Sequence, residues 1–229
     1  MELQRKRIGG KDILLRDSKS LTSAALHFSG VLLAFWGLIL LMASAGNQAE
    51  DSLEIISYLV FGVSLIALYG ASTAYHVFYI SEPVHNILRK LDHIMIFFLI
   101  AGTYTPLCLI TLQGPIGWVL FGLVWGISIV GTIMKVFWIA APRWLSALIY
   151  VLLGWMIVFA FVPLSRSLPT GGIISLVTGG IIYTIGAILY AKKVELFSSK
   201  WFGNHELFHI FVLLGSCCHY WMVLRYVSV

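Results

Sequence analysis

Residues 204–226 read NHELFHIFVLLGSCCHYWMVLRY, an apolar run of membrane-spanning length that opens with two histidines. His205 and His209 are four residues apart, so on a helix their side chains lie on one face, about one turn from each other. Imidazole nitrogens at this spacing can hold one divalent metal ion, most often zinc. The alternative is a pair of buried histidines that bond to neighbouring helices. Because an ionisable pair inside a membrane span is costly, we interpret it as functional.

The whole chain has the composition of a membrane protein. Of its 229 residues 59% are hydrophobic and 11% are charged, and its mean hydropathy is +0.92, whereas soluble domains carry about 25% charged residues. We therefore predict an all-α, multi-pass protein of the cell membrane, a bundle of seven transmembrane helices. The predicted spans lie near residues 22–45, 53–78, 92–112, 116–138, 144–163, 171–191 and 204–226. Residues 1–21 are predicted to form a basic cytoplasmic N-terminal segment without strands, and residues 22–229 a single transmembrane domain.

The basic residues predict the orientation of the bundle. With the N-terminus in the cytoplasm, all 15 Lys and Arg residues except Arg166 and Arg225 lie on the inner side. The opposite orientation would reverse this distribution, so the positive-inside rule favours a cytoplasmic N-terminus and, after seven crossings, an external C-terminus. The formal net charge of +5 then reflects topology and contact with anionic lipids, and no nucleic-acid partner is expected.

This topology brings polar residues from three spans to one depth. The second span ends on the inner side near His76, and the third is predicted to begin there with Asp92 in its first turn. The seventh begins on the same side with His205 and His209 in its first two turns. Ser72 lies one turn from His76 on the same helix face. Three histidines with an open position are the usual arrangement of a catalytic zinc, so the convergence favours metal binding.

Three motifs in this order resemble the bacterial hemolysin III proteins, which belong with the progestin and adipoQ receptors, including the adiponectin receptors. The motifs are Ser72-x-x-x-His76, Leu91-Asp92-His93 leading to Ala101-Gly102-Thr103-Tyr104-Thr105-Pro106, and His205-x-x-x-His209. The resemblance covers the whole chain, including its seven spans. It implies Zn²⁺ held by His76, His205 and His209, with Asp92 and Ser72 beside the metal-bound water. It also implies a cytoplasmic N-terminus.

The segment His205-Glu206-Leu207-Phe208-His209 also matches H-E-x-x-H, the metalloprotease signature in which the glutamate is the general base. Such proteases generally need a further ligand downstream of the motif. His219 is ten residues along the same helix, about 15 Å away, and cannot join the pair while that helix is intact. An intramembrane zinc protease is therefore the weaker hypothesis, and Glu206 is a conditional base only.

The four remaining histidines are not predicted as metal ligands, although His93 belongs to the second motif. His93 follows Asp92 but is rotated by about 100° from it on a helix, so we expect it outside the ligand set. The other three are interpreted as packing or interfacial residues: His27, His85 and His219.

The predicted site suits lipid chemistry. A zinc ion with an open position acidifies bound water and polarises a carbonyl, while Asp92 could deprotonate that water and Ser72 could stabilise an oxyanion. Its depth suits membrane lipids or another acyl-chain substrate with its amide or ester at the interface, and the resemblance implies lipid amide hydrolysis of the ceramidase type. Two alternatives stay open: a non-catalytic sensor of membrane lipid state with structural zinc, and a cytolytic pore-former. The pore hypothesis lacks a polar stripe along several spans, and the sequence predicts no particular oligomeric state.

The charge distribution gives a first test. A reporter that is active only outside the cytoplasm should be active when fused after Val229 and silent when fused before Met1 or within residues 80–90. The opposite pattern would show that the predicted orientation is reversed. Silence of the reporter at both ends would contradict an odd number of spans.

Overall fold

The computed structural model describes residues 4–8, 11–15, 18–45, 52–192 and 199–227. Arg16 and Lys193, which entered the orientation count, lie outside these ranges. The described residues contain seven helical segments long and apolar enough to cross a membrane, so the predicted all-α, multi-pass membrane fold is confirmed. These segments are α1 (Ser18–Ala45), α2 (Ser52–Val77), α3 with η1 (Glu82–Pro106, Leu107–Leu112), α4 (Gly114–Phe137), α5 with η2 and α6 (Arg143–Gly154, Trp155–Ala160, Phe161–Ser167), α7 (Thr170–Lys192), and α8 with η3 (Asn204–Met222, Val223–Val227).

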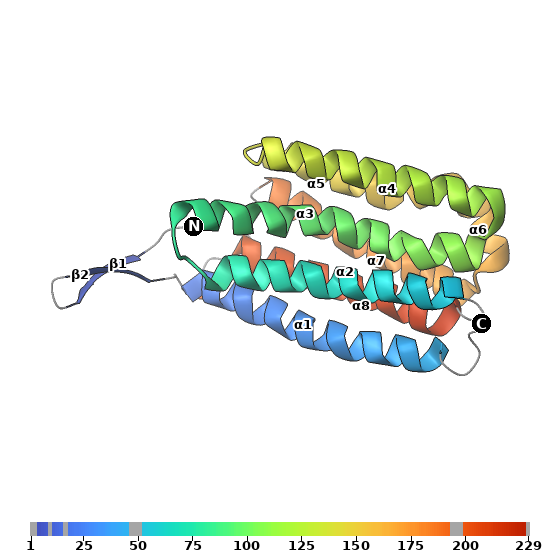
Figure 1. The fold of residues 1–229 in the computed structure, drawn as a ribbon, viewed down its shortest axis with the longest axis horizontal. Coiled ribbons are helices and arrows are strands. Elements are labelled where there is room, and N and C mark those ends of the chain that lie inside the picture. The colour runs from blue at the N-terminus through green and yellow to red at the C-terminus, as the bar shows by residue number, and fades with distance from the viewer. Residues whose placement is uncertain (1–3, 9–10, 16–17, 46–51, 193–198, 228–229) are drawn as a thin grey trace.

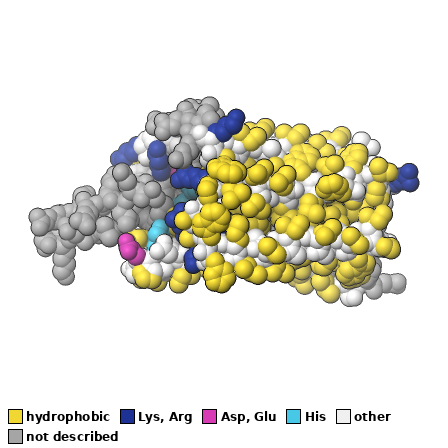
Figure 2. All heavy atoms as spheres, turned by 90° about the horizontal axis from the view of Figure 1, so that it is seen from above, with side chains coloured by type: hydrophobic (Ala, Val, Ile, Leu, Met, Phe, Trp, Pro, Cys, Tyr) yellow, Lys and Arg dark blue, Asp and Glu magenta, His cyan; other side chains and the backbone are white. Residues whose placement is uncertain are grey.

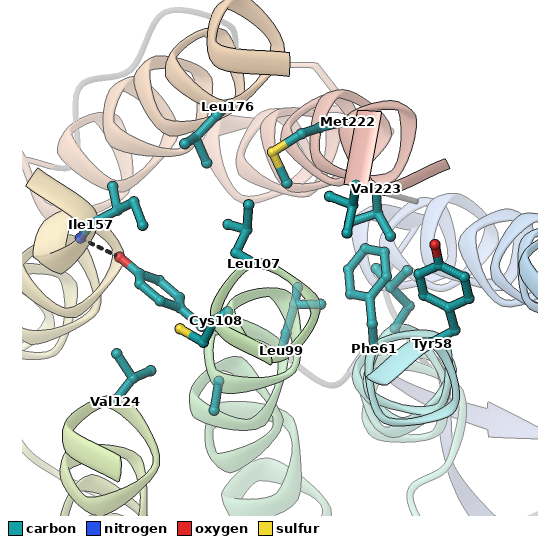
Figure 3. Packing of buried hydrophobic residues seen from close by; sticks show 14 of the residues in the cluster. Tyr58, Phe61, Leu99, Leu107, Cys108, Val124, Ile157, Leu176, Met222 and Val223 are labelled. Atoms are coloured by element: carbon teal, nitrogen blue, oxygen red, sulfur yellow. Dashed lines mark hydrogen bonds between the residues drawn. The ribbon is translucent and has the colours of Figure 1, made fainter. Parts of the chain in front are cut away.

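The helices form one bundle in which sequence neighbours lie side by side (Figure 1). α2 packs against α1 and α3, and α8 packs against α1 and α7, so the last helix returns to the first. Large apolar side chains pack between them, with Tyr58 and Phe61 of α2 near Met222 of α8 and Val223 of η3 (Figure 3). Other apolar side chains cover the outside, while Lys and Arg gather mainly at one end (Figure 2). This distribution is the one that a hydrocarbon environment requires.

The N-terminal segment departs from the prediction because it contains two short strands. β1 (Gln4–Ile8) pairs antiparallel with β2 (Lys11–Leu15). The sequence signal for this hairpin is the Gly-Gly dipeptide at positions 9 and 10, since two-residue hairpin loops favour glycine. The expectation of a segment without strands is therefore wrong for these residues, and the all-α description applies to the membrane domain.

The third span begins ten residues earlier than predicted. α3 starts at Glu82, after Ser81 in an extended conformation and with Pro83 in its first turn, both ordinary signals for a helix start. The sequence prediction followed hydropathy and so missed the polar turns before Asp92. Asp92 consequently lies about 15 Å along α3 rather than in its first turn, and the preceding turns carry Arg89 and Lys90.

Three spans change their helix type along their length, at η1, η2 and η3. α3 continues after Pro106 as the π-helical turn η1, since proline cannot donate the usual backbone hydrogen bond. In the fifth span the α-helix tightens to the 3₁₀ turn η2 after Gly154. The Tyr104 hydroxyl donates to Gly154 O at 2.7 Å and accepts from Ile157 N at 2.8 Å. A side chain of α3 thus bonds two backbone groups at this transition, which satisfies them inside an apolar bundle.

Candidate metal centre

The three histidines of the predicted triad meet at one end of the bundle. His205 Nε2 lies 3.1 Å from His76 Nε2 and 3.1 Å from His209 Nε2. One nitrogen from each histidine lies within 4.8 Å of the other two. Nitrogens bound to one tetrahedral zinc-sized ion are about 3.3 Å apart, because each metal–nitrogen bond is about 2.0 Å long. The donor set and its spacing therefore fit a single metal ion held by α2 and α8.

The helices place these side chains by simple rules. His76 stands in the last turn of α2, and His205 and His209 stand in the first two turns of α8, where the i, i+4 spacing puts both rings on one face. His76 and His209 are buried, whereas His205 is half-buried. The triad is therefore more open on the His205 side.

Ser20 of α1 contacts both the ring and the backbone of His76. Its Oγ lies 3.4 Å from His76 Nδ1 and donates a hydrogen bond to His76 O at 2.9 Å. A metal on Nε2 leaves the ring proton on Nδ1, where Ser20 Oγ can accept it. Such contacts to the second ring nitrogen fix the orientation of a metal-binding imidazole.

Ser72 and Asp92 lie together beside the triad but outside it. Ser72 is fully buried one turn before His76, and its hydroxyl interacts with the Asp92 carboxylate without reaching hydrogen-bonding geometry. Asp92 Oδ2 lies 3.8 Å from His93 Nδ1, and the Asp92 side chain is 15% exposed. Among the described residues, the group with metal-binding spacing contains the three histidines and no carboxylate. The structure therefore offers a hydroxyl and a carboxylate that do not belong to the triad.

Glu206 is directed away from the three histidine nitrogens and toward α1. Its Oε1 accepts a hydrogen bond from Ser23 Oγ at 2.8 Å, and its Oε2 accepts one from Gly203 N at 2.8 Å. The second bond caps the first turn of α8. Both oxygens of Glu206 thus have structural partners: Ser23 ties α8 to α1, and Gly203 caps α8 itself.

His27 is the residue that the sequence interpretation missed. Its ring stacks on the ring of His209 with a centroid distance of 3.8 Å and an interplanar angle of 14°. The side chain is buried, and neither nitrogen has a hydrogen-bond partner in the described part of the chain. The signal was present in the spacing: Ser20, Ser23 and His27 follow i, i+3, i+7 and form one polar face of an otherwise apolar span. All three contact residues of the metal centre, so this face of α1 completes its surroundings.

The other histidines occupy separate positions. His219 is buried against Gly179 and Tyr183, whose ring centroid is 5.4 Å away. His85 stacks on Tyr75 at 4.8 Å. Both are ring-packing residues, as expected. His93 bonds through Nδ1 to Arg89 O at 2.9 Å and is outside the triad.

Comparison with known proteins identifies the relatives of this chain. The family described as Haemolysin-III related matches residues 17–220. Hemolysin-3 of Bacillus cereus is 37% identical over 209 residues, which cover 91% of this chain and 92% of that protein. The Hemolysin-3 homolog of Bacillus subtilis (strain 168) is 36% identical over 208 residues, covering 91% and 94%. More distantly, the adiponectin receptor protein of Drosophila melanogaster is 24% identical over 231 aligned residues, covering 85% of this chain and 47% of the receptor.

The geometry predicts how single substitutions change metal content. His205→Ala should remove most of the bound metal, because two remaining imidazoles hold a divalent ion weakly at neutral pH. His27→Ala should lower metal affinity by about 10–100-fold, the usual effect of losing a residue that orients a ligand. His27→Phe should restore most of that affinity, because it keeps a ring against His209.

Metal per chain in detergent-purified protein, measured by mass spectrometry of the elements during titration with a chelator, checks these expectations. His219→Ala is the matched control, since it removes a buried histidine of the same helix outside the centre. Equal metal content in wild type and His205→Ala would refute the site. Failure of His27→Phe to restore affinity would show that His27 acts through its nitrogens and not through stacking.

Proposed function

This chain belongs to the hemolysin III family, and from that premise we propose that it is a zinc-binding membrane protein that hydrolyses an amide or ester bond of a membrane lipid. The observation that carries the proposal is the convergence of His76, His205 and His209 beside a separate hydroxyl–carboxylate pair, Ser72 and Asp92. A metal that served packing alone would have no need of these two groups.

The donor set favours zinc among the divalent ions. Three imidazole nitrogens without a thiolate or a carboxylate form the N₃ arrangement that zinc hydrolases use, with one position left for a reactant. Bound zinc would supply Lewis acidity and acidify a coordinated water. Metal ions that prefer oxygen ligands, such as Mg²⁺ and Ca²⁺, fit this set poorly.

The side chains of Asp92 and Ser72 are suited to proton transfer and to oxyanion binding, respectively. Asp92 is half-buried next to Ser72 and His93, and its Oδ2 lies 3.8 Å from His93 Nδ1. It is therefore available to accept a proton from an attacking water. The Ser72 hydroxyl has no hydrogen-bond partner among the described residues, so it can donate to the substrate oxygen on which negative charge develops.

The position of the centre suits a lipid substrate. The triad lies where α2 ends and α8 begins, within one to two turns of the end of the apolar bundle. Large apolar side chains cover the outside of the same helices. An acyl chain can lie along this surface while its amide or ester reaches the centre, so we propose acylated membrane lipids as the substrate class.

A structural role for zinc is the second candidate, because the centre also ties helices together. The triad joins α2 to α8, while Ser20 and Ser23 of α1 bond to His76 and Glu206. In that case the protein would sense or adjust the lipid state of the membrane without turnover. The two candidates make opposite predictions for Asp92.

Asp92→Asn separates the two functions. If the protein is a hydrolase, this variant should keep its zinc and its thermal stability but lose about 10²–10⁴ in turnover, because the proton acceptor is removed. Ser72→Ala should lose about 10²-fold if its hydroxyl is one oxyanion donor. The measurement is hydrolysis of a panel of acyl amides and esters in detergent micelles, with zinc content determined on the same samples.

Glu206→Gln is the matched carboxylate control. Gln has one oxygen acceptor where Glu206 has two, so the substitution should weaken the contacts to Ser23 and Gly203 and lower stability. Turnover per zinc-loaded molecule should stay near that of wild type. Zinc-dependent turnover that disappears in Glu206→Gln and survives in Asp92→Asn would instead favour the protease chemistry. No zinc-dependent turnover across the panel would leave the structural role.

A further inference from the structure

Lys135 is a buried cation that the proposed chemistry does not use. It lies in the last turn of α4, three residues before Trp138, and only 1% of its surface is exposed. Its Nζ donates one hydrogen bond, to Ser146 Oγ of α5 at 2.5 Å. Ser146 itself is buried and lies 3.5 Å from Pro142 O. The partner of this ammonium group is therefore a neutral hydroxyl.

The charge of Lys135 is not balanced within the described structure. An ammonium group has three donors, and one of them has a partner here. In the described residues, a salt bridge with a nitrogen–oxygen distance under 4.0 Å joins His93 to Asp92. Lys135 forms no such salt bridge there. A buried charge without a counter-charge is expensive, so a bound anion would stabilise this arrangement.

Two further cations lie at the same end of the bundle as Lys135. The Arg89 guanidinium of α3 is near enough to repel it. Arg143 at the start of α5 lies over the Tyr190 ring, 5.5 Å from its centroid. Both arginines are exposed. Helices α3, α4, α5 and α7 thus place three cations and a tyrosine at the same end of the bundle.

This cationic cluster, Arg89, Lys135 and Arg143, adjoins the metal centre. His93 is within electrostatic reach of Lys135 and Arg89, and it is also within reach of His205. The Tyr150 hydroxyl donates to His93 O at 3.0 Å, which fixes α5 against α3 at this point. A group bound by the cluster would therefore lie next to the triad.

Ordinary membrane topology explains the two arginines but not Lys135. Basic residues at the ends of spans usually extend their charged heads into water or among lipid headgroups. Lys135 does the opposite, because its side chain is buried and bonded to Ser146 of α5, while the Arg89 guanidinium is close enough to repel it. The positive-inside distribution therefore does not account for its burial.

We propose that Arg89, Lys135 and Arg143 bind the phosphate group of an anionic membrane phospholipid. Phosphate oxygens can accept hydrogen bonds from both an ammonium and a guanidinium group, and such charge-assisted bonds are the strong ones. The cluster lies at the end of α4 and the start of α5, where the predicted spans should meet the membrane surface. Basic sites between transmembrane helices at this depth are suited to anionic headgroups. The site is distinct from the metal centre, and it stands whether or not the protein is a hydrolase.

The test compares lipid binding by native mass spectrometry and thermal unfolding in a neutral detergent. The probes are dioleoyl phosphatidylglycerol, dioleoyl phosphatidylcholine, inorganic phosphate and oleate. Wild type should bind phosphatidylglycerol in preference to phosphatidylcholine and unfold at a higher temperature in its presence. Lys135→Met should weaken that binding about tenfold or more. Lys135→Arg should retain it because the positive charge remains.

Lys192→Met is the matched control, since it removes an exposed cation from the end of α7 on the same side of the bundle. It should bind phosphatidylglycerol as wild type does. Without lipid, Lys135→Met should unfold at the same or a higher temperature, because it replaces an unbalanced buried charge with an apolar side chain of similar size. Zinc content should be unchanged in every variant, which keeps this test separate from the proposed hydrolase activity.

Three results would overturn the proposal. Equal affinity for phosphatidylglycerol in wild type and Lys135→Met would show that the cluster is not the site. Saturation by inorganic phosphate at the concentrations that suffice for the lipid would assign the cluster to a free anion. Binding of oleate without phosphatidylglycerol would assign it to a carboxylate.

Discussion

The meeting of His76 with His205 and His209 joins two helices that are distant in the sequence, and much of this end of the bundle is arranged around it. Polar groups between membrane helices must find partners within the protein, because hydrocarbon offers none. Helix α1 supplies several of them: Ser20 bonds to His76, while His27 stacks on His209. A metal ion on the three nitrogens would turn these separate contacts into one cross-linked unit.

The bundle divides its polar chemistry between two neighbouring regions at one end. The metal centre is built by α1, α2 and α8 with Asp92 of α3, and the cationic cluster is built by α3, α4 and α5. Helix α3 contributes to both, and its His93 is in electrostatic reach of Lys135 and His205. If both proposals hold, an anion-binding group would lie beside a metal-binding group near the end of the spans, where a lipid would present a phosphate and an acyl linkage together.

The sequence predicted the number of spans and the shared face of His205 and His209 because both depend on short-range rules, and the topology placed His76 at the same depth. Apolar runs report membrane crossings, and the i, i+4 spacing reports which side chains share a face. It did not predict that α3 begins at Glu82, since those first turns are polar and hydropathy is blind to them. The role of His27 depends on a contact with a helix more than 180 residues away, and the burial of Lys135 depends on how α4 meets α5. Such contacts between helices are set by packing and not by local sequence spacing. The polar face of α1, in contrast, can be predicted from the spacing of Ser20, Ser23 and His27.

X-ray absorption at the zinc edge of the protein as isolated from membranes tests the central claim most directly. If zinc binds at the triad, the spectrum should show three imidazole nitrogens and one further light atom at about 2.0–2.1 Å. A shell of sulfur atoms at about 2.3 Å would place the metal on cysteines instead. That result, or a protein isolated without zinc that does not take it up, would contradict the metal centre described here.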